Sequence, residues 1–205
     1  MDPREFPTKG NLMLAKNSLA LAHQGYDLMD KKRNILLKEL MELIDEAKNI
    51  QEEIDTTFTK AYVCLQRANI EQGISKVQEL AFTVPIEESI RIQTRSIMGT
   101  EIPHIKYDDK QNDLTYAFGT TKESIDIARE AFRQVKNLTI KLAEVENAAY
   151  RLAANIKKTQ KRANALKNIT IPMYSNLVYT INNALEEKER EEFTRLKVIK
   201  RMQGK

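Results

Sequence analysis

A seven-residue repeat of apolar side chains runs through residues 12–68, which read LMLAKNSLALAHQGYDLMDKKRNILLKELMELIDEAKNIQEEIDTTFTKAYVCLQRA. The repeated positions are Leu12, Ala15, Leu19, Ala22, Tyr26, Met29, Arg33, Leu36, Leu40, Leu43, Ala47, Ile50, Ile54, Thr57, Ala61, Cys64 and Ala68. Only Arg33 and Thr57 interrupt the apolar series, and no proline occurs within it. Because a seam that recurs every ~3.5 residues is buried only against another helix, the pattern predicts one long helix within a coiled coil.

The second half of the chain offers the partner seam. Its positions are Val135, Leu138, Leu142, Val145, Ala149, Leu152, Ile156, Thr159, Ala163 and Leu166. With a turn between them, the two seams meet antiparallel. The sequence therefore predicts an all-α, elongated fold, a two-helix coiled coil in which many small contacts replace a thick core.

Four segments follow from this pattern. We expect an extended segment over residues 1–8, a coiled-coil helix over 9–80, a small head over 81–121 and a second coiled-coil helix over 122–205. Thr8 is a candidate N-cap for the first helix. Within the head, residues 90–107 alternate well enough to form a β-hairpin that turns near Met98, Gly99 and Thr100, and residues 108–113 form a polar loop.

Pro172 is the one proline inside the second helical pattern. A proline lacks a backbone donor and clashes with the carbonyl four residues before it, so a kink is expected near Asn168 to Pro172. The apolar phase also shifts here and continues through Leu177, Ile181, Leu185, Phe193, Leu196 and Ile199. Arg33, on the first seam, either extends its head into solvent or bonds the carbonyl of Asn168 that Pro172 leaves unpaired.

The charge pattern argues against a nucleic-acid binder. The net charge is +4, charged residues make up 30% of the chain, and the two signs alternate along most of the helical pattern, as on a solvated face. The exception is the basic tail of Arg195, Lys197, Lys200, Arg201 and Lys205. This tail suits either an acidic partner surface or the negative end of a helix dipole.

The chain shows no sign of export or of membrane insertion. Its single cysteine, Cys64, forms no internal disulfide and suits a reducing compartment. We expect the protein in the cytoplasm. No stretch approaches the roughly 18 apolar residues of a membrane span, and the start of the chain lacks the apolar core of a signal peptide. Any membrane link is expected to run through partner proteins.

Catalytic and ligand-binding motifs are not found in the sequence. No glycine begins a phosphate-binding loop of either common type. His23, His104 and Cys64 lack the spacing of a zinc site, and no glycine elbow presents a nucleophile. We therefore expect no catalytic residue, no cofactor and no metal.

Residues 161–197, KRANALKNITIPMYSNLVYTINNALEEKEREEFTRLK, strongly resemble the C-terminal signature of the D subunit, the central-shaft subunit of rotary V/A-type ATPases. That signature contains a basic residue, Asn-Ala-Leu, Ile-Pro and an acidic run that ends E-R-E-E-F-x-R-L-K. It is matched by Arg162, Asn164, Ala165, Leu166, Ile171, Pro172, Glu189, Arg190, Glu191, Glu192, Phe193, Arg195, Leu196 and Lys197.

Three further blocks are similar to the same family. They are FPTK at residues 6–9, Gly25 to Leu36, and RSIMGTEIPHI at residues 95–105. Two departures stand out: Phe6 replaces the common Asn, and Asn34 with Ile35 replaces the usual acidic pair after Lys-Arg.

The resemblance implies a rotor component that binds the small F subunit and turns inside a hexamer of A and B subunits. ATP is hydrolysed at the A/B interfaces, and rotation passes through the C subunit to a membrane ring that carries protons or sodium ions. The hexamer contact is expected at Phe193, Arg195, Leu196, Lys197, Lys200 and Arg201, and a docking point of the head at Ile97, Met98, Gly99, Ile102 and Pro103. The alternative is a stand-alone coiled-coil scaffold or chaperone-like protein without a motor.

Overall fold

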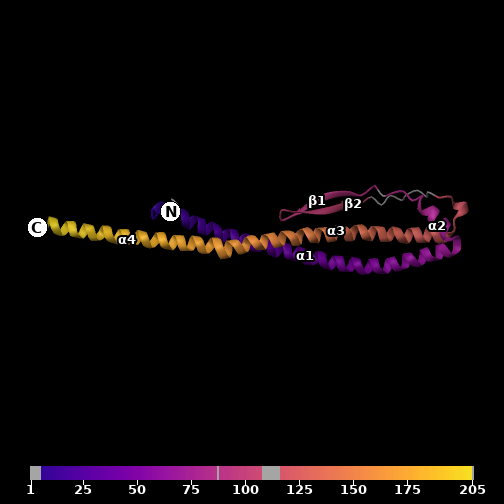
Figure 1. The fold of residues 1–205 in the computed structure, drawn as a ribbon, viewed down its shortest axis with the longest axis horizontal. Coiled ribbons are helices and arrows are strands. Elements are labelled where there is room, and N and C mark those ends of the chain that lie inside the picture. Colours follow the sequence, from indigo (N-terminus) through magenta and orange to yellow (C-terminus); the bar gives the residue numbers. More distant parts are fainter. Residues whose placement is uncertain (1–5, 87, 108–115, 205) are drawn as a thin grey trace. The chain divides into compact units, whose positions relative to one another are not determined.

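The computed structural model describes residues 6–86, 88–107 and 116–204. Its elements, in chain order, are α1 (Lys9–Gln72), α2 (Ile74–Ala81), β1 (Arg91–Ile97), β2 (Thr100–Lys106), a 3-10 turn η2 (Phe118–Thr120), α3 (Glu123–Ala165), a π-helical turn η3 (Leu166–Thr170) and α4 (Ile171–Gln203) (Figure 1). The long N-terminal and C-terminal helices, with a hairpin between them, confirm the predicted helical class. The first five residues and the predicted polar loop lie outside the described residues.

The chain divides into two compact units. The terminal unit comprises Met1–Ile35 and Ile156–Lys205, and the central unit comprises Leu36–Asn155. α1 and α3 each contribute to both units.

Local signals set both ends of α1. Thr8 caps the start, because its hydroxyl accepts a hydrogen bond from the Asn11 amide at 3.2 Å and its carbonyl accepts one from Leu12 at 3.0 Å. The predicted N-cap is therefore confirmed. At the other end Gly73 takes a φ of 89°, which most residues avoid, so that α1 stops and the short helix α2 begins.

In the central unit the second part of α1 lies antiparallel to α3. Tyr62 on α1 meets Phe132 on α3 edge to face, with ring centroids 5.7 Å apart. Further along α1, Lys122 donates from Nζ to the carbonyl of Glu71 at 2.9 Å. The buried apolar side chains of this pair are Leu36, Ile54, Ala61, Ala68, Ile125, Ala128, Val135, Val145, Ala148 and Leu152.

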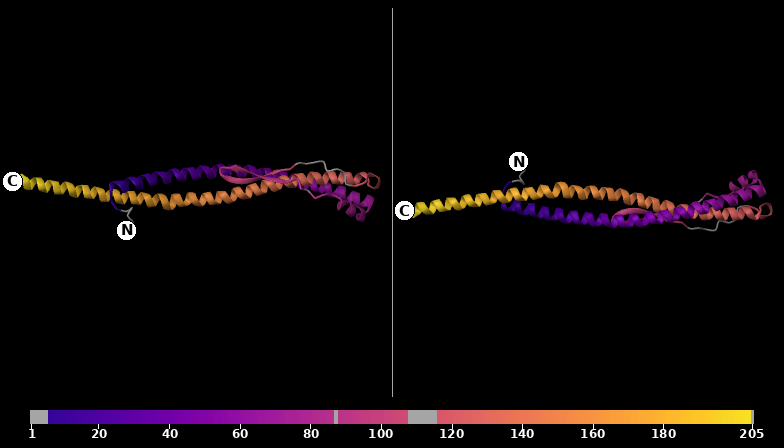
Figure 2. Two further views of the ribbon diagram at one scale, coloured as in Figure 1. Left: turned by 90° about the horizontal axis from the view of Figure 1, so that it is seen from above. Right: turned by 90° about the horizontal axis from the view of Figure 1, so that it is seen from below.

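In the terminal unit the first part of α1 lies antiparallel to the end of α3 and to α4 (Figure 2). Lys9 pairs with Glu189 at 3.2 Å, and the Tyr26 ring lies 5.8 Å from the Lys167 ammonium. A methyl group built on Gly25 would make an ordinary contact with Leu166 at 3.8 Å. Ala15, Ala22, Ala163 and Ile181 are buried here.

The hypothesis that Arg33 bonds the Asn168 carbonyl is wrong. Arg33 donates from Nη1 to Gln160 Oε1 at 2.9 Å and pairs through Nη2 with Asp30 at 2.7 Å. Its remaining partner is the Asn34 side chain. The register explains the difference, because it sets Leu166 beside Gly25 and so carries Asn168 past Arg33 along α1.

The π-helical turn accounts for the shift in apolar phase. The Ile171 amide bonds the Leu166 carbonyl five residues back, one residue more than in an α-helix. A strict continuation of the heptads from Ala163 would bury Met173 and Thr180, but both are exposed, whereas Ile181 is 1% exposed. The extra residue lies directly before Pro172, which cannot donate to the helical ladder. The kink expected at Pro172 stays a prediction.

The hairpin forms where alternation predicts it. β1 pairs antiparallel with β2 from Arg91 opposite Lys106 to Ile97 opposite Thr100. Met98 and Gly99 make the turn with φ values of 49° and 73°. Two positive φ values are what a two-residue type I′ turn requires, and this turn suits the twist of paired strands.

Candidate interaction surfaces

The predicted seam residues all lie at buried or half-buried positions. Leu36, Ile54, Val135, Val145 and Leu152 are buried in the central unit. The half-buried seam positions are Leu19, Tyr26, Met29, Leu40, Leu43, Ile50, Leu138, Leu142, Ile156 and Leu166, and Ala22 is buried. Cys64 is half-buried as a free thiol. These residues join helices within each unit and leave other surfaces for partners.

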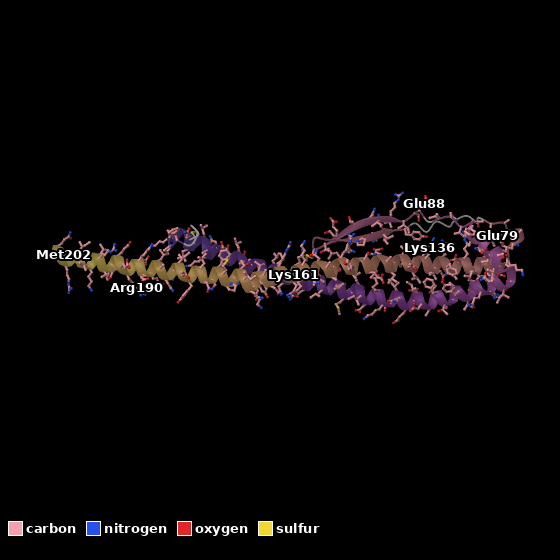
Figure 3. All side chains as sticks on the ribbon, viewed as in Figure 1. Glu79, Glu88, Lys136, Lys161, Arg190 and Met202 are labelled. Carbon is pink, nitrogen blue, oxygen red and sulfur yellow. The ribbon has the colours of Figure 1, made fainter. Side chains whose placement is uncertain are left out.

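The last turns of α4 expose both apolar and basic side chains. Figures 1 and 2 show this end continuing past the start of α1. Phe193 is 69% exposed and Leu196 65%, and Ile199 and Met202 are also exposed. The predicted contact residues Arg195, Lys197, Lys200 and Arg201 are exposed as well. In Figure 3 no other ribbon lies beside the end of α4 at Met202. We call residues 193–202 the α4 end.

The predicted docking residues of the head fall into two groups. Ile102 is buried, at 7% exposed, and Ile97 and Pro103 are half-buried. Met98 is 49% exposed at the turn, beside exposed Gly99. Three of the five residues therefore face the chain's own interior, and the turn faces outward.

Side chains of α3 hold the hairpin through its second strand. Asn155 donates to the hydroxyl of Thr100, and Arg151 donates to the Glu101 carbonyl at 3.3 Å. The Glu144 carboxylate binds His104 Nδ1 at 2.8 Å and accepts the Ile105 amide at 3.1 Å. These contacts were missed from the sequence, because none of the three α3 residues belongs to a seam.

Exposed apolar side chains lie on α2 and before and after it along the chain. Ile70 is 85% exposed, Ile74 72%, Phe82 82% and Ile86 89%. No residue of α2 is buried. The heptad pattern did not predict these exposed residues, because three of the four follow the end of α1, where the pattern has already stopped. Exposed apolar side chains that follow one another along one segment are candidates for a protein contact. We call these four residues the α2 patch.

A polar cluster links the end of α1 to the start of α3 in the central unit. The Ser124 hydroxyl, and then the Arg67 guanidinium, lower the pKa of Glu71 from its usual 4.5. Arg67 Nε lies 3.0 Å from the Glu71 carboxylate. Lys122 caps the carbonyl of the same residue, where a positive charge suits the end of a helix.

We expect this cluster to weaken in acid. Because the pKa of Glu71 is lower in the folded chain, its stabilising effect is present above pH 4.5 and is lost as the pH falls through the lowered pKa. Glu71→Gln should reduce the thermal stability at pH 7 and flatten its decline below pH 4.5. Melting curves between pH 3 and 7 test this, with Glu146→Gln on an exposed position of α3 as the control. An unchanged acid limb in Glu71→Gln would contradict the assignment.

In residues 6–86, 88–107 and 116–204, no group of three His, Cys, Asp or Glu side chains could hold a metal ion. In the same residues, no helix is long and apolar enough to cross a membrane.

Comparisons with known proteins point to one family. The family model for the D subunit of ATP synthase matches residues 11–201. The chain is 43% identical over 194 residues to the D subunit of the V-type ATP synthase of Thermotoga neapolitana, covering 95% of this chain and 96% of the relative. It is 38% identical over 197 residues to the D subunit of the A-type ATP synthase of Pyrococcus abyssi, covering 95% and 92%. An A-type D subunit from Methanosphaera stadtmanae is 34% identical over 198 residues, with the same coverage. The chain, with its paired terminal helices and its hairpin, thus belongs to the D-subunit family of ATP synthases.

Proposed function

We propose that this chain is the central rotor subunit of a V/A-type ATP synthase. It couples ATP hydrolysis or synthesis in a hexamer of A and B subunits to proton or sodium-ion transport. The observation that carries the proposal is the α4 end, an apolar and basic helix face that no other described segment of the terminal unit covers. Binding of this face to a partner protein would remove its apolar side chains from water, which favours the complex.

The proposed role requires transmission of torque, and the chain's packing suits it. Leu36, Leu152 and Ile181 are almost fully buried, and helices locked by such contacts resist sliding. The chain itself contributes no catalysis in this proposal; ATP chemistry belongs to the A and B subunits.

The charges of α4 suit contacts that must break and re-form. Arg190 lies 3.8 Å from Glu186, and Arg195 lies 4.0 Å from Glu191. All four side chains are more than half exposed, and exposed ion pairs contribute only about 0–1 kcal/mol. Such pairs can exchange partners with a small change in free energy. A rotor that turns between similar binding positions in the hexamer requires this.

Two further partners complete the proposal. The F subunit binds the same rotor, and the C subunit connects it to the membrane ring. We assign the α2 patch to the C subunit, because the patch belongs to the central unit and its apolar residues are not those of the α4 end. The protein is then peripheral to the membrane on its cytoplasmic side.

Reconstitution with the purified partners tests the proposal. The labelled chain is mixed with A and B, with F and with C, separately and together, and the complexes are weighed by native mass spectrometry. We expect one copy of the chain in each A/B hexamer. A chain that stays outside the hexamer, or that associates only with itself or with unfolded clients, would favour a scaffold or chaperone-like protein.

A further inference from the structure

The two outer edges of the hairpin differ in the contacts that they make with the rest of the central unit. In a hairpin closed by a two-residue turn, Ile97 and Thr100 form the first hydrogen-bonded pair, and hydrogen-bonded and non-bonded pairs then alternate. The backbone groups of Glu101, Pro103 and Ile105 therefore point away from β1. On the first strand, those of Ser96, Thr94 and Ile92 point away from β2.

The outer edge of β2 is closed by α3. Arg151 donates a hydrogen bond to the Glu101 carbonyl, and the Glu144 carboxylate accepts one from the Ile105 amide. Between them stands Pro103, which has no amide hydrogen to offer. No further strand can pair along this edge.

The outer edge of β1 is open. The residues of β1 are exposed except for half-buried Ile97. Within the described part of the chain, the outward backbone groups of Ile92, Thr94 and Ser96 have no hydrogen-bond partner. An edge of this length without proline or a bulge is a template for another strand.

We propose that β1 receives an extended segment of another component of the ATP synthase, which adds as a third strand. Arg91 and Arg95 lie on one face of β1, and Ile92 lies on the other. A strand that fits carries acidic residues across from the two arginines and an apolar residue across from Ile92. Main-chain hydrogen bonds supply the affinity and these side chains the specificity.

The charges disfavour a second copy of this chain as the occupant. Two antiparallel β1 strands centred on Thr94 would bring four arginine side chains onto a narrow ribbon, with no acidic residue of β1 to offset them. The inference rests on the proposed function, since the partner belongs to the same assembly.

Residue-resolved amide exchange tests the inference and carries its own control. In the isolated full-length chain, the amides of Gln93, Arg95 and Ile97 pair with β2 and exchange slowly, whereas those of Ile92, Thr94 and Ser96 exchange fast. In the complex reconstituted with the A, B, F and C subunits, we expect the second group to slow by about tenfold or more.

Two variants at one position separate strand addition from other contacts. Thr94→Pro removes an outward amide without breaking a bond to β2, and Thr94→Val keeps that amide with a similar shape. Slow exchange at Gln93 and Arg95 confirms that the proline variant keeps the hairpin. We expect Thr94→Pro to abolish the added protection at Ile92 and Ser96, and Thr94→Val to retain it.

The outcomes are distinct. A chain that enters the complex while Ile92, Thr94 and Ser96 stay fast overturns the inference and leaves the rotor proposal intact. Protection that appears in the chain alone at high concentration overturns it in favour of self-association. Equal protection in both variants overturns strand addition. Exclusion of the chain from the complex overturns the proposed function and, with it, the inference.

Discussion

Replacing Leu152 by alanine is expected to lower the free energy of unfolding by about 2–5 kcal/mol. Leu152 is 0% exposed and lies on the α3 seam of the central unit, so its removal leaves a cavity that the helix backbones cannot close. This is a large share of the roughly 5–15 kcal/mol that stabilises a typical domain. Urea unfolding followed by circular dichroism measures the effect.

Tyr150 on the same helix provides the control. Its side chain is 77% exposed, so Tyr150→Ala should change the unfolding free energy by no more than about 0.5 kcal/mol. Similar losses in the two variants would show that the heptad seam does not stabilise the central unit. If both variants melt as the wild type does, the predicted helix pairing is rejected.

The triple variant Phe193→Ser, Leu196→Ser and Ile199→Ser is expected to weaken binding to the A/B hexamer by about a hundredfold or more, roughly 3 kcal/mol. The three side chains are each at least 50% exposed, so the chain should fold and melt unchanged. The loss arises because each serine removes apolar area that the partner would bury. Titration of labelled chain with hexamer gives the dissociation constant.

The α2 patch offers a matched control for this loss. Ile70→Ser, Ile74→Ser and Phe82→Ser remove comparable exposed apolar area from the central unit. We expect this second variant to bind the A/B hexamer normally and to lose affinity for the C subunit, and the first variant to do the reverse. Loss of both partners in either variant would indicate a non-specific effect. Normal hexamer binding by the α4 variant would contradict the assignment of the α4 end as the hexamer contact.

Several structural features could be predicted because they depend on neighbours along the chain. Thr8 caps a helix through a residue three positions away, and Met98 and Gly99 turn the hairpin through their own backbone angles. The class of fold and the place of the hairpin follow from periodicity in the same way. The apolar and basic residues of the α4 end can also be read from the sequence, and their role as a contact stays a prediction.

Other features depend on contacts across the chain, and the sequence pattern did not reveal them. Arg33 reaches Gln160 because of a register that no local pattern records. Glu144, Arg151 and Asn155 look like ordinary exposed residues of α3 until the hairpin is docked against them. The α2 patch was likewise missed, because exposure is a property of the folded neighbourhood.

By itself, the sequence determined the helical class, the place of the hairpin and the cap at Thr8, because these depend on periodicity and on short-range backbone preferences. Only the tertiary structure decided the register between helices, the one-residue π insertion before Pro172 and the choice of β1 as the open edge. The physical reason is that a seam repeats every seven residues and so allows several registers. Single contacts between distant residues, such as Arg33 with Gln160 and Glu144 with Ile105, select one of them.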